Sequence, residues 1–127
     1  MSQPDVKTIA VVEDNPDNRL LLRVLLQERF RLREYADGES AASGIVGDPP
    51  DLVLMDISLP DIGGIEVLHR IRHSGRLARL PVIALTAHAM VGDRERFLAA
   101  GFDFYVSKPI LGLDQLLNPI EMLLTRS

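Results

Sequence analysis

The sequence predicts an α/β fold in which a doubly wound, five-stranded parallel sheet lies between helices. Short apolar runs and segments of helical periodicity alternate five times along its 127 residues. Most of the apolar runs lack polar alternation, which indicates strands that are buried on both faces, as in a parallel sheet. Strands that alternate with helices imply crossover connections, and the right-handed rule leaves few topologies for them. For a chain of this length we expect the strand order 2-1-3-4-5.

The composition agrees with one domain and excludes several classes of site. With 46% apolar residues the chain can build a real core, and its net charge of -4 gives no support for nucleic-acid binding. Because there is no cysteine, disulfides and thiolate metal sites are impossible, and the composition fits a reducing cytoplasm. No apolar run approaches the roughly 20 residues of a membrane span, and residues 1–5 lack the apolar stretch of a signal peptide.

The first strand and helix are predicted at residues 8–12 and 16–28. The strand is almost wholly apolar, Asn15 suits the N-cap, and Pro16 suits the first helical position. The apolar residues of this helix spread over roughly 240° of arc, whereas a helix buried on one side needs a stripe of little more than ~100°. Two interpretations stay open: unusually generous core packing, or one helix edge that docks a partner.

The second and third units begin with strands of different character. Residues 30–33 alternate between apolar and charged, which indicates an edge strand with one solvated face, and a weak helix follows over residues 37–46. The third strand, residues 51–56, has four apolar residues in a row and ends on Asp56. The chain turns sharply at Gly63 and Gly64, and a helix with apolar residues at helical spacing follows.

The fourth and fifth units are predicted from two further apolar strands, at residues 81–86 and 104–106. The helix between them spans about residues 91–100, carries acidic residues early and ends at Gly101, which suits a left-handed helix end. The last helix places on one face Leu113, Leu116, Leu117, Ile120 and Leu124. Pro119 falls inside it and should kink or break it at a cost of about 3 kcal/mol, unless Asn118 caps a restarted helix.

Polar residues follow four of the five strands at their carboxyl ends. Glu13 and Asp14 follow the first strand, Asp56 and Thr86 end the third and fourth, and Lys108 follows the fifth. In a sheet of order 2-1-3-4-5 these ends meet at one edge, which is where ligands bind in open α/β sheets. Three carboxylates and one lysine in one pocket call for a hard divalent cation held by oxygen ligands. Mg²⁺ is the natural candidate, because it uses few protein carboxylates and keeps water ligands that a phosphate displaces.

Such a pocket suits the transfer of a phosphoryl group to a carboxylate. A carboxylate can act as the nucleophile towards phosphorus and form an aspartyl phosphate. The metal and Lys108 would offset the charge of the phosphoryl oxygens, and Thr86 could donate a hydrogen bond to one of them. Each residue alone also has a purely structural explanation, such as Asp14 capping the first helix. Their joint placement at four strand ends favours phosphoryl transfer.

Five short motifs resemble the receiver domain of the two-component response-regulator family, the CheY-like domains with a flavodoxin-like (βα)5 fold. They are VVED at 11–14, DLVLMD at 51–56, LP at 59–60, LTA at 85–87 and KP at 108–109. The resemblance covers essentially the whole chain, residues 1–127, as a single receiver domain. Residues 86–96 further resemble single-domain receivers and the receivers of hybrid kinases, and the short ends of the chain lean towards a stand-alone receiver.

The resemblance implies a role for each residue of the pocket. Asp56 is the phosphoacceptor, and Mg²⁺ is held by Glu13, Asp14, Asp56 and the backbone carbonyl of Ser58. Thr86 and Lys108 contact the phosphoryl group. Tyr105 is the aromatic switch residue, whose ring turns inward as Thr86 moves. The resemblance also implies a cis peptide bond between Lys108 and Pro109. Ser58 and His88 match variable positions that tune the hydrolysis of the phosphoryl group.

The expected function is that of a phosphorelay switch. A histidine kinase or a histidine phosphotransfer protein donates to Asp56, and the face formed by the fourth helix, fifth strand and fifth helix changes its affinity for a downstream protein. The alternative is a phosphate-independent interaction module on the same fold, against which the complete acidic pocket argues. A turnover enzyme is not expected, because residues 56–58 lack a second acid two positions after Asp56. We expect a cytoplasmic protein without nucleic-acid or membrane partners.

Overall fold

Five parallel strands form the central sheet of the computed structural model, which describes residues 6–87 and 92–125. They are β1 (Thr8–Val12), β2 (Arg31–Tyr35), β3 (Leu52–Asp56), β4 (Val82–Thr86) and β5 (Phe104–Ser107). All neighbouring strands run parallel, and the order β2-β1-β3-β4-β5 confirms the predicted topology. β2 and β5 are therefore the edge strands, and β1 and β3 lie side by side at the switch point.

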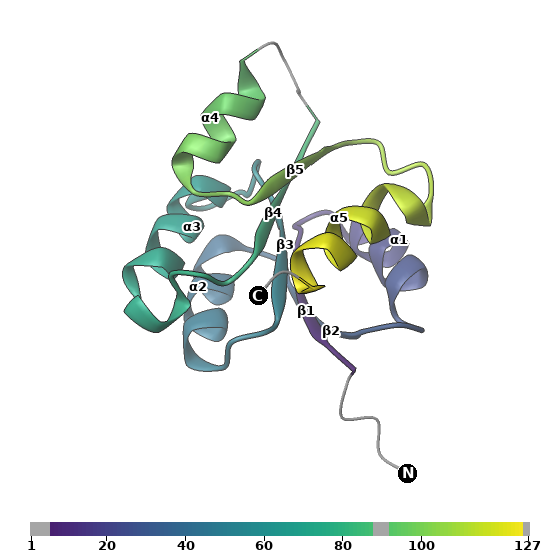
Figure 1. Cartoon of the computed structure of the whole chain (residues 1–127), viewed down its shortest axis with the longest axis horizontal. Coiled ribbons are helices and arrows are strands. Elements are labelled where there is room, and N and C mark those ends of the chain that lie inside the picture. The colour runs from purple at the N-terminus through teal and green to yellow at the C-terminus, as the bar shows by residue number, and fades with distance from the viewer. Residues whose placement is uncertain (1–5, 88–91, 126–127) are drawn as a thin grey trace.

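Helices cover both faces of the sheet (Figure 1). They are α1 (Pro16–Leu26), α2 (Gly38–Gly47), α3 (Gly63–His73), α4 (Asp93–Ala100) and α5 (Leu113–Thr125), with a short 3-10 turn, η1 (Gly75–Leu77), that the sequence did not predict. α1 and α5 lie on one face, and α2, α3 and α4 lie on the other. Within the part of the chain that the structure describes, no helix is both long and apolar enough to cross a bilayer.

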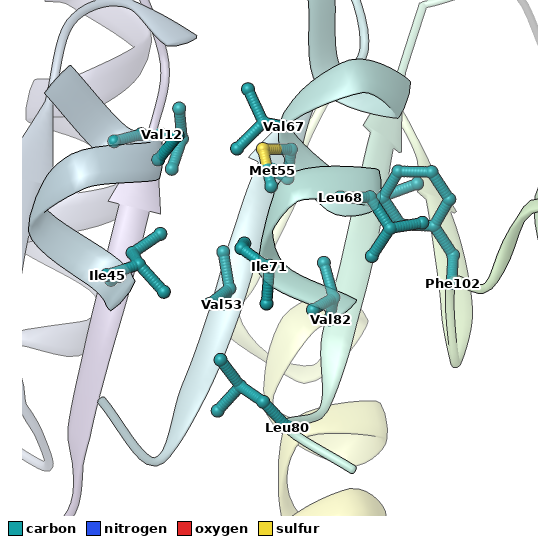
Figure 2. Close-up of a cluster of buried hydrophobic side chains, with 14 of the residues drawn as sticks. Val12, Ile45, Val53, Met55, Val67, Leu68, Ile71, Leu80, Val82 and Phe102 are labelled. Carbon is teal, nitrogen blue, oxygen red and sulfur yellow. The ribbon is translucent and has the colours of Figure 1, made fainter. Parts of the chain in front are cut away.

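Each face of the sheet carries its own apolar core. On the face covered by α2 and α3, Val53 and Met55 of β3 lie among side chains from β1, β4 and these helices, as Figure 2 shows. On the opposite face, Leu52 and Leu54 pack with residues of α1 and α5. All five residues of β3 are buried. The missing polar alternation is thereby explained, because both sets of alternate side chains enter a core.

α1 begins as predicted and ends earlier than predicted. The Asn15 side chain accepts hydrogen bonds from the backbone amides of Asp17 and Asn18, and Pro16 is the first helical residue. The helix ends at Leu26 rather than at about residue 28. The reason is that the next residues form a tight turn, in which the backbone amides of two successive residues, Arg29 and Phe30, both donate to the Leu26 carbonyl.

The apolar arc of α1 is only partly used for core packing. Leu22 and Leu26 are buried, whereas Leu20, Leu21 and Val24 are 50%, 38% and 58% exposed. Generous core packing therefore does not account for the whole arc, and one apolar edge of the helix faces solvent. That this edge docks a partner stays a prediction.

The ends of α4 depend on two glycines with left-handed backbone. The predicted start near Val91 lies outside the described residues; the described helix begins at Asp93, directly after Gly92 with φ of 91°. It ends at Gly101, as predicted, with φ of 116°. Such positive φ angles strain any residue with a Cβ atom, so glycine allows a sharp entry and exit for this short helix.

Pro119 lies inside α5 without ending it. The helix runs from Leu113 to Thr125, so the predicted break, and the alternative of a restart capped by Asn118, are both wrong. The helix persists because its inner face is held by packing, with Leu116, Ile120 and Leu123 buried against the sheet. Tertiary packing of an apolar stripe contributes more to helix stability than local propensity does, and it outweighs the hydrogen bond that a proline lacks.

Candidate active site

The strand register brings the predicted residues to one edge of the sheet. Val12 of β1 pairs with Met55 of β3, so the residues that follow them, Glu13 and Asp56, lie level with each other. On the other side, Thr86 pairs with Ser107, the residue directly before Lys108. The side chains at this edge are not solvated like ordinary surface groups, since Glu13, Asp56 and Thr86 are only 1%, 4% and 5% exposed.

Three carboxylates converge at this edge. One oxygen each from Glu13, Asp14 and Asp56 lies within 4.8 Å of the others. Glu13 and Asp56 are buried, whereas Asp14 is exposed, so the cluster opens to solvent on the Asp14 side. A set of clustered carboxylate oxygens with one open side suits a hard cation that keeps some of its water.

Lys108, the residue directly after β5, reaches into the cluster. Its Nζ donates to Glu13 Oε1 at 2.8 Å and lies 3.2 Å from Asp56 Oδ2. Its backbone amide donates to the Thr86 carbonyl at 2.7 Å, which fixes the strand end from which the side chain extends. The peptide bond between Lys108 and Pro109 is cis, as predicted.

The charges of the cluster do not balance. Three carboxylates and one ammonium group leave a formal charge of -3 + 1 = -2. Burial is the main cause that raises the pKa of Glu13; the hydrogen bond from Lys108 opposes this rise, and neighbouring Asp56 adds to it. Burial also acts on Lys108, but the hydrogen bond to Glu13 and the charges of both carboxylates outweigh it and raise the pKa of Lys108. A divalent cation would supply the missing charge, so the donor set fits Mg²⁺.

The carboxylate of Asp56 is oriented by its own loop. The Ser58 backbone amide donates to Asp56 Oδ1 at 2.9 Å, which leaves Oδ2 on the side of Lys108. The loop then enters α3, and an added Cβ at Gly64, the second residue of this helix, would lie 2.6 Å from the Asp56 carbonyl oxygen. The start of α3 therefore packs directly against the end of β3 and leaves Asp56 little freedom to shift.

Tyr105 lies on β5 and packs against α4. Its half-buried ring packs 6.1 Å from the ring of Phe97 and 6.3 Å from that of Phe104, measured between centroids. This position beside α4 is where a switch residue would couple the site to that helix, but the switch role itself stays a prediction. His88, predicted to influence hydrolysis, lies outside the described residues.

Two side chains that brace the loops after β1 and β3 were not predicted. Arg19 of α1 donates from Nη1 to the carbonyls of Glu13 and Asp14, at 2.9 and 3.1 Å. Asp61 accepts hydrogen bonds at 2.8 Å from the amides of Gly38 and Glu39 and so ties the loop after β3 to the start of α2. Arg19 carries a weak sequence signal, since helical side chains lean towards the preceding turn and hence towards the acidic loop. Asp61 carries none.

A cavity of about 380 Å³ adjoins the site between α1 and the chain that follows β5. It is lined mainly by apolar groups, among them Leu21, Leu22 and Ile110, together with Glu13 and Lys108. Leu21 also belongs to the exposed edge of α1. An apolar surface thus lies directly beside the acidic cluster.

Comparison with known proteins places these features in one family. The family model described as "Response regulator receiver domain" matches residues 9–121. The polar-differentiation response regulator DivK of Brucella anthropi is 42% identical over 108 residues, which are 82% of this chain and 85% of DivK. The signal transduction histidine-protein kinase BarA of Escherichia coli is also 42% identical, over 107 residues that are 81% of this chain but only 11% of BarA.

Solved structures agree with these sequence relatives. The receiver domain of sensor histidine kinase PA1611 from Pseudomonas aeruginosa superposes with a TM-score of 0.87 at 34% identity. The superposition covers 95% of this chain and 99% of that one, and that structure has a magnesium ion coordinated in its active site cleft. The chemotaxis protein CheY4 of Vibrio cholerae, at 20% identity and a TM-score of 0.85, covers 93% of this chain and 98% of its own and shares the fold.

Proposed function

Because the chain belongs to the response regulator receiver domain family and is therefore a receiver domain of two-component signalling, we propose that Asp56 is the residue that accepts the phosphoryl group. The observation that supports this most directly is the setting of its carboxylate. Asp56 is buried at the carboxyl edge of β3, with Oδ1 held by the Ser58 amide and Oδ2 beside the Lys108 ammonium group. Of the three carboxylates in the cluster, Asp56 alone is a buried residue of the middle strand, β3, because Glu13 follows β1 and Asp14 is exposed.

The proposed metal ligands are the side chains of Glu13, Asp14 and Asp56 and the backbone carbonyl of Ser58. The formal charge of -2 in the cluster and the open side at Asp14 support Mg²⁺ as the cation. When bound, Mg²⁺ would offset negative charge on the phosphoryl oxygens. The magnesium ion in the PA1611 receiver domain is consistent with the same type of site here.

In the proposed reaction, an oxygen of Asp56 attacks the phosphorus of a phosphohistidine. The phosphorus–nitrogen bond breaks as the new phosphorus–oxygen bond forms, and the imidazole leaves with the electron pair and takes up a proton. Lys108 exchanges its contact with Asp56 for a phosphoryl oxygen, and the Thr86 hydroxyl donates to another. The approach of two anions is slow without such groups, so these residues support the reaction by electrostatic stabilisation.

The phosphorylated site would act on two surfaces. Movement of Thr86 and the Tyr105 ring would alter the face made by α4, β5 and α5, which we propose as the surface for a downstream protein. For the donor, a histidine kinase or a histidine phosphotransfer protein, we propose the exposed apolar edge of α1, formed by Leu20, Leu21 and Val24. Its position beside the cavity that adjoins Lys108 supports this placement.

Three further properties belong to the same proposal. The chain works as one receiver domain over residues 1–127, acts as a switch rather than a turnover enzyme, and is cytoplasmic without nucleic-acid or membrane partners. Fractionation of cells that express the chain tests the location. An assay with phosphate esters tests the second property, because turnover at enzyme-like rates would contradict it.

The phosphoacceptor is tested by the intact mass of the protein after incubation with acetyl phosphate and Mg²⁺. We expect one phosphoryl adduct on the wild type and on Asp51→Asn, and none on Asp56→Asn or without metal. Asp51 is the matched control, because it precedes the same strand and lies at the opposite edge, where it accepts a hydrogen bond from the Thr8 amide. An equal adduct on Asp56→Asn would sink the assignment.

The absence of any adduct on the wild type would favour the phosphate-independent interaction module. Mg²⁺ titration then separates that alternative from a receiver that reacts only with its own kinase. A receiver with an intact acidic cluster still binds the metal, whereas a module that never meets phosphate has no need of it.

A further inference from the structure

We infer that Arg19 is a positioning residue for the metal site: it holds the backbone of the acidic pair Glu13 and Asp14 so that their carboxylates stay together. The inference rests on the proposed metal site and adds a residue to it. Arg19 touches neither the proposed metal ligand atoms nor Asp56 through any hydrogen bond that the structure shows. Its guanidinium acts on the other side of the loop, at the peptide carbonyls.

The contacts of Arg19 are directed at both peptide groups of the acidic pair. Nη1 donates to the Glu13 carbonyl at 2.9 Å and to the Asp14 carbonyl at 3.1 Å. On the other flank, the Glu13 amide donates to the Tyr35 carbonyl of β2 at 3.0 Å, and the Asn15 amide donates to Glu13 Oε2 at 3.2 Å. The loop is thus fixed by partners from α1 and β2, and Arg19 supplies both carbonyl contacts.

Arg19 is itself held in place by an acidic partner. Its Nε lies 3.7 Å from Glu34 Oε1 on β2, and its side chain is 22% exposed. Glu34 in turn accepts two hydrogen bonds from Arg23, at 2.6 and 2.7 Å. The guanidinium therefore bridges α1, β2 and the acidic loop, and its planar shape allows all these contacts from one rotamer.

Fixing the loop matters because carboxylates of like charge repel one another. Without a support, the loop could relieve the repulsion between Glu13, Asp14 and Asp56 by moving away from β3. A metal would then have to reassemble its ligands on binding, at a cost in affinity. Residues that orient metal ligands from outside the coordination shell typically change metal affinity by about 10- to 100-fold when they are mutated.

The test is calorimetric Mg²⁺ titration of the wild type and three variants: Arg19→Gln, Arg19→Lys and Arg23→Gln. We expect Arg19→Gln to bind Mg²⁺ about tenfold more weakly. Arg19→Lys should fall between this variant and the wild type, because its one ammonium group keeps the charge but cannot hold both carbonyls and pair with Glu34. Arg23→Gln is the matched control, since it removes the other guanidinium that pairs with Glu34 but does not contact the acidic loop. Its Mg²⁺ affinity should stay within about twofold of the wild-type value.

Other outcomes would overturn the inference. Equal Mg²⁺ binding by Arg19→Gln would mean that the two carbonyl contacts do not affect the metal site. Tighter binding would mean that the lost repulsion between the guanidinium and the metal outweighs any effect on the loop geometry. Wild-type affinity in Arg19→Lys, or equal weakening in Arg23→Gln, would likewise remove the specific role of the two carbonyl contacts. If Arg19→Gln does not fold, Arg19→Lys decides by the same criterion. If the wild type binds no Mg²⁺, the proposed metal site is wrong and the inference fails with it. If the wild type binds Mg²⁺ and Arg19→Gln binds it with the same affinity, the inference alone is overturned.

Discussion

At the scale of single residues, Lys108 explains how the site exists before any metal arrives. Glu13 and Asp56 are buried carboxylates at neighbouring strand ends, and an unpaired buried charge is strongly destabilising. One ammonium group lies within 3.2 Å of an oxygen of each. In the proposed reaction, the same contacts would leave Lys108 beside the incoming phosphoryl oxygens, so one cation would both stabilise the resting fold and support the reaction.

The ion pair between Arg23 of α1 and Glu34 of β2 contributes to folding stability in a way that depends on pH. The hydrogen bonds from Arg23 are the main cause that holds the pKa of Glu34 below its usual value of 4.5, against a smaller opposing effect of burial. Because the folded state favours the carboxylate, this contribution to stability is complete above pH 4.5 and is lost as the pH falls through the lowered pKa.

We therefore expect Glu34→Gln to be less stable than the wild type at neutral pH, and the difference to shrink as the pH falls below 4.5. Urea unfolding of both proteins from neutral to acid pH measures it. All other carboxylates are present in both proteins, so their pH-dependent contributions to the unfolding free energy cancel in the comparison. A difference in unfolding free energy that stays constant across this range would contradict the prediction.

At the scale of secondary structure elements, the junction of β3 and α3 sets the position of Asp56. An added Cβ at Gly64 would lie 2.6 Å from the Asp56 carbonyl oxygen and 3.0 Å from the Ile57 Cα, and both neighbours are backbone atoms that cannot rotate away. At Gly47, the last residue of α2, the same atom would meet nothing within 4 Å. The two glycines therefore form a matched pair.

We expect Gly64→Ala to lower the free energy of unfolding by about 1–3 kcal/mol, as overpacking does, and to weaken Mg²⁺ binding because the Asp56 backbone must shift. Gly47→Ala should leave both quantities nearly unchanged, or raise stability by up to about 1 kcal/mol as a better helix residue. Urea unfolding and Mg²⁺ titration of both variants provide the measurements. Equal effects at the two positions would show that the contact with Asp56 does not matter.

The elements also show what a sequence can and cannot reveal. The buried strands were predictable because a continuous apolar run must enter two cores, and the helix start at Asn15 was predictable because its cap is local. β2 was predicted too short, since it extends to the polar residues Glu34 and Tyr35, which pair with β1 at an edge. The site residues at strand ends were predictable from topology. Asp61 was missed because its hydrogen-bond partners lie 22 and 23 residues away in the sequence. Arg19 was missed because a helical arginine that donates to carbonyls of the preceding loop leaves only a weak sequence signal.

At the scale of the whole molecule, attachment to the sheet is uneven among the helices. α5 buries four residues, among them Leu116, Ile120 and Leu123. Of the eight residues of α4, all within the described part of the chain, only Phe97 is buried. The far end of α4 is tied to α3 by Arg72, which donates to the Gly101 carbonyl at 2.8 Å and to Asp103 at 3.0 Å. α4 is thus a short helix with one fully buried side chain and one anchored end.

This arrangement predicts where the molecule opens. A helix with few buried apolar contacts unfolds locally at a lower free energy than the core does. We expect backbone amides of α4 to exchange hydrogen at least about tenfold faster than those of α1, α3 and α5, as measured by mass spectrometry of native-state exchange.

Phosphoryl transfer should then act on the part of the fold that is easiest to move. Treatment with acetyl phosphate and Mg²⁺ should change exchange most in α4 and β5, because the ring of Tyr105 on β5 packs against Phe97 of α4. The same treatment of Asp56→Asn is the control and should leave the pattern unchanged. Equal protection of α4 and α5 before treatment, or a change spread evenly over the sheet after it, would argue against a switch that works through α4. The phosphoryl group shifts the equilibrium only as far as it interacts more favourably with one state than with the other, and that difference must then lie elsewhere in the fold.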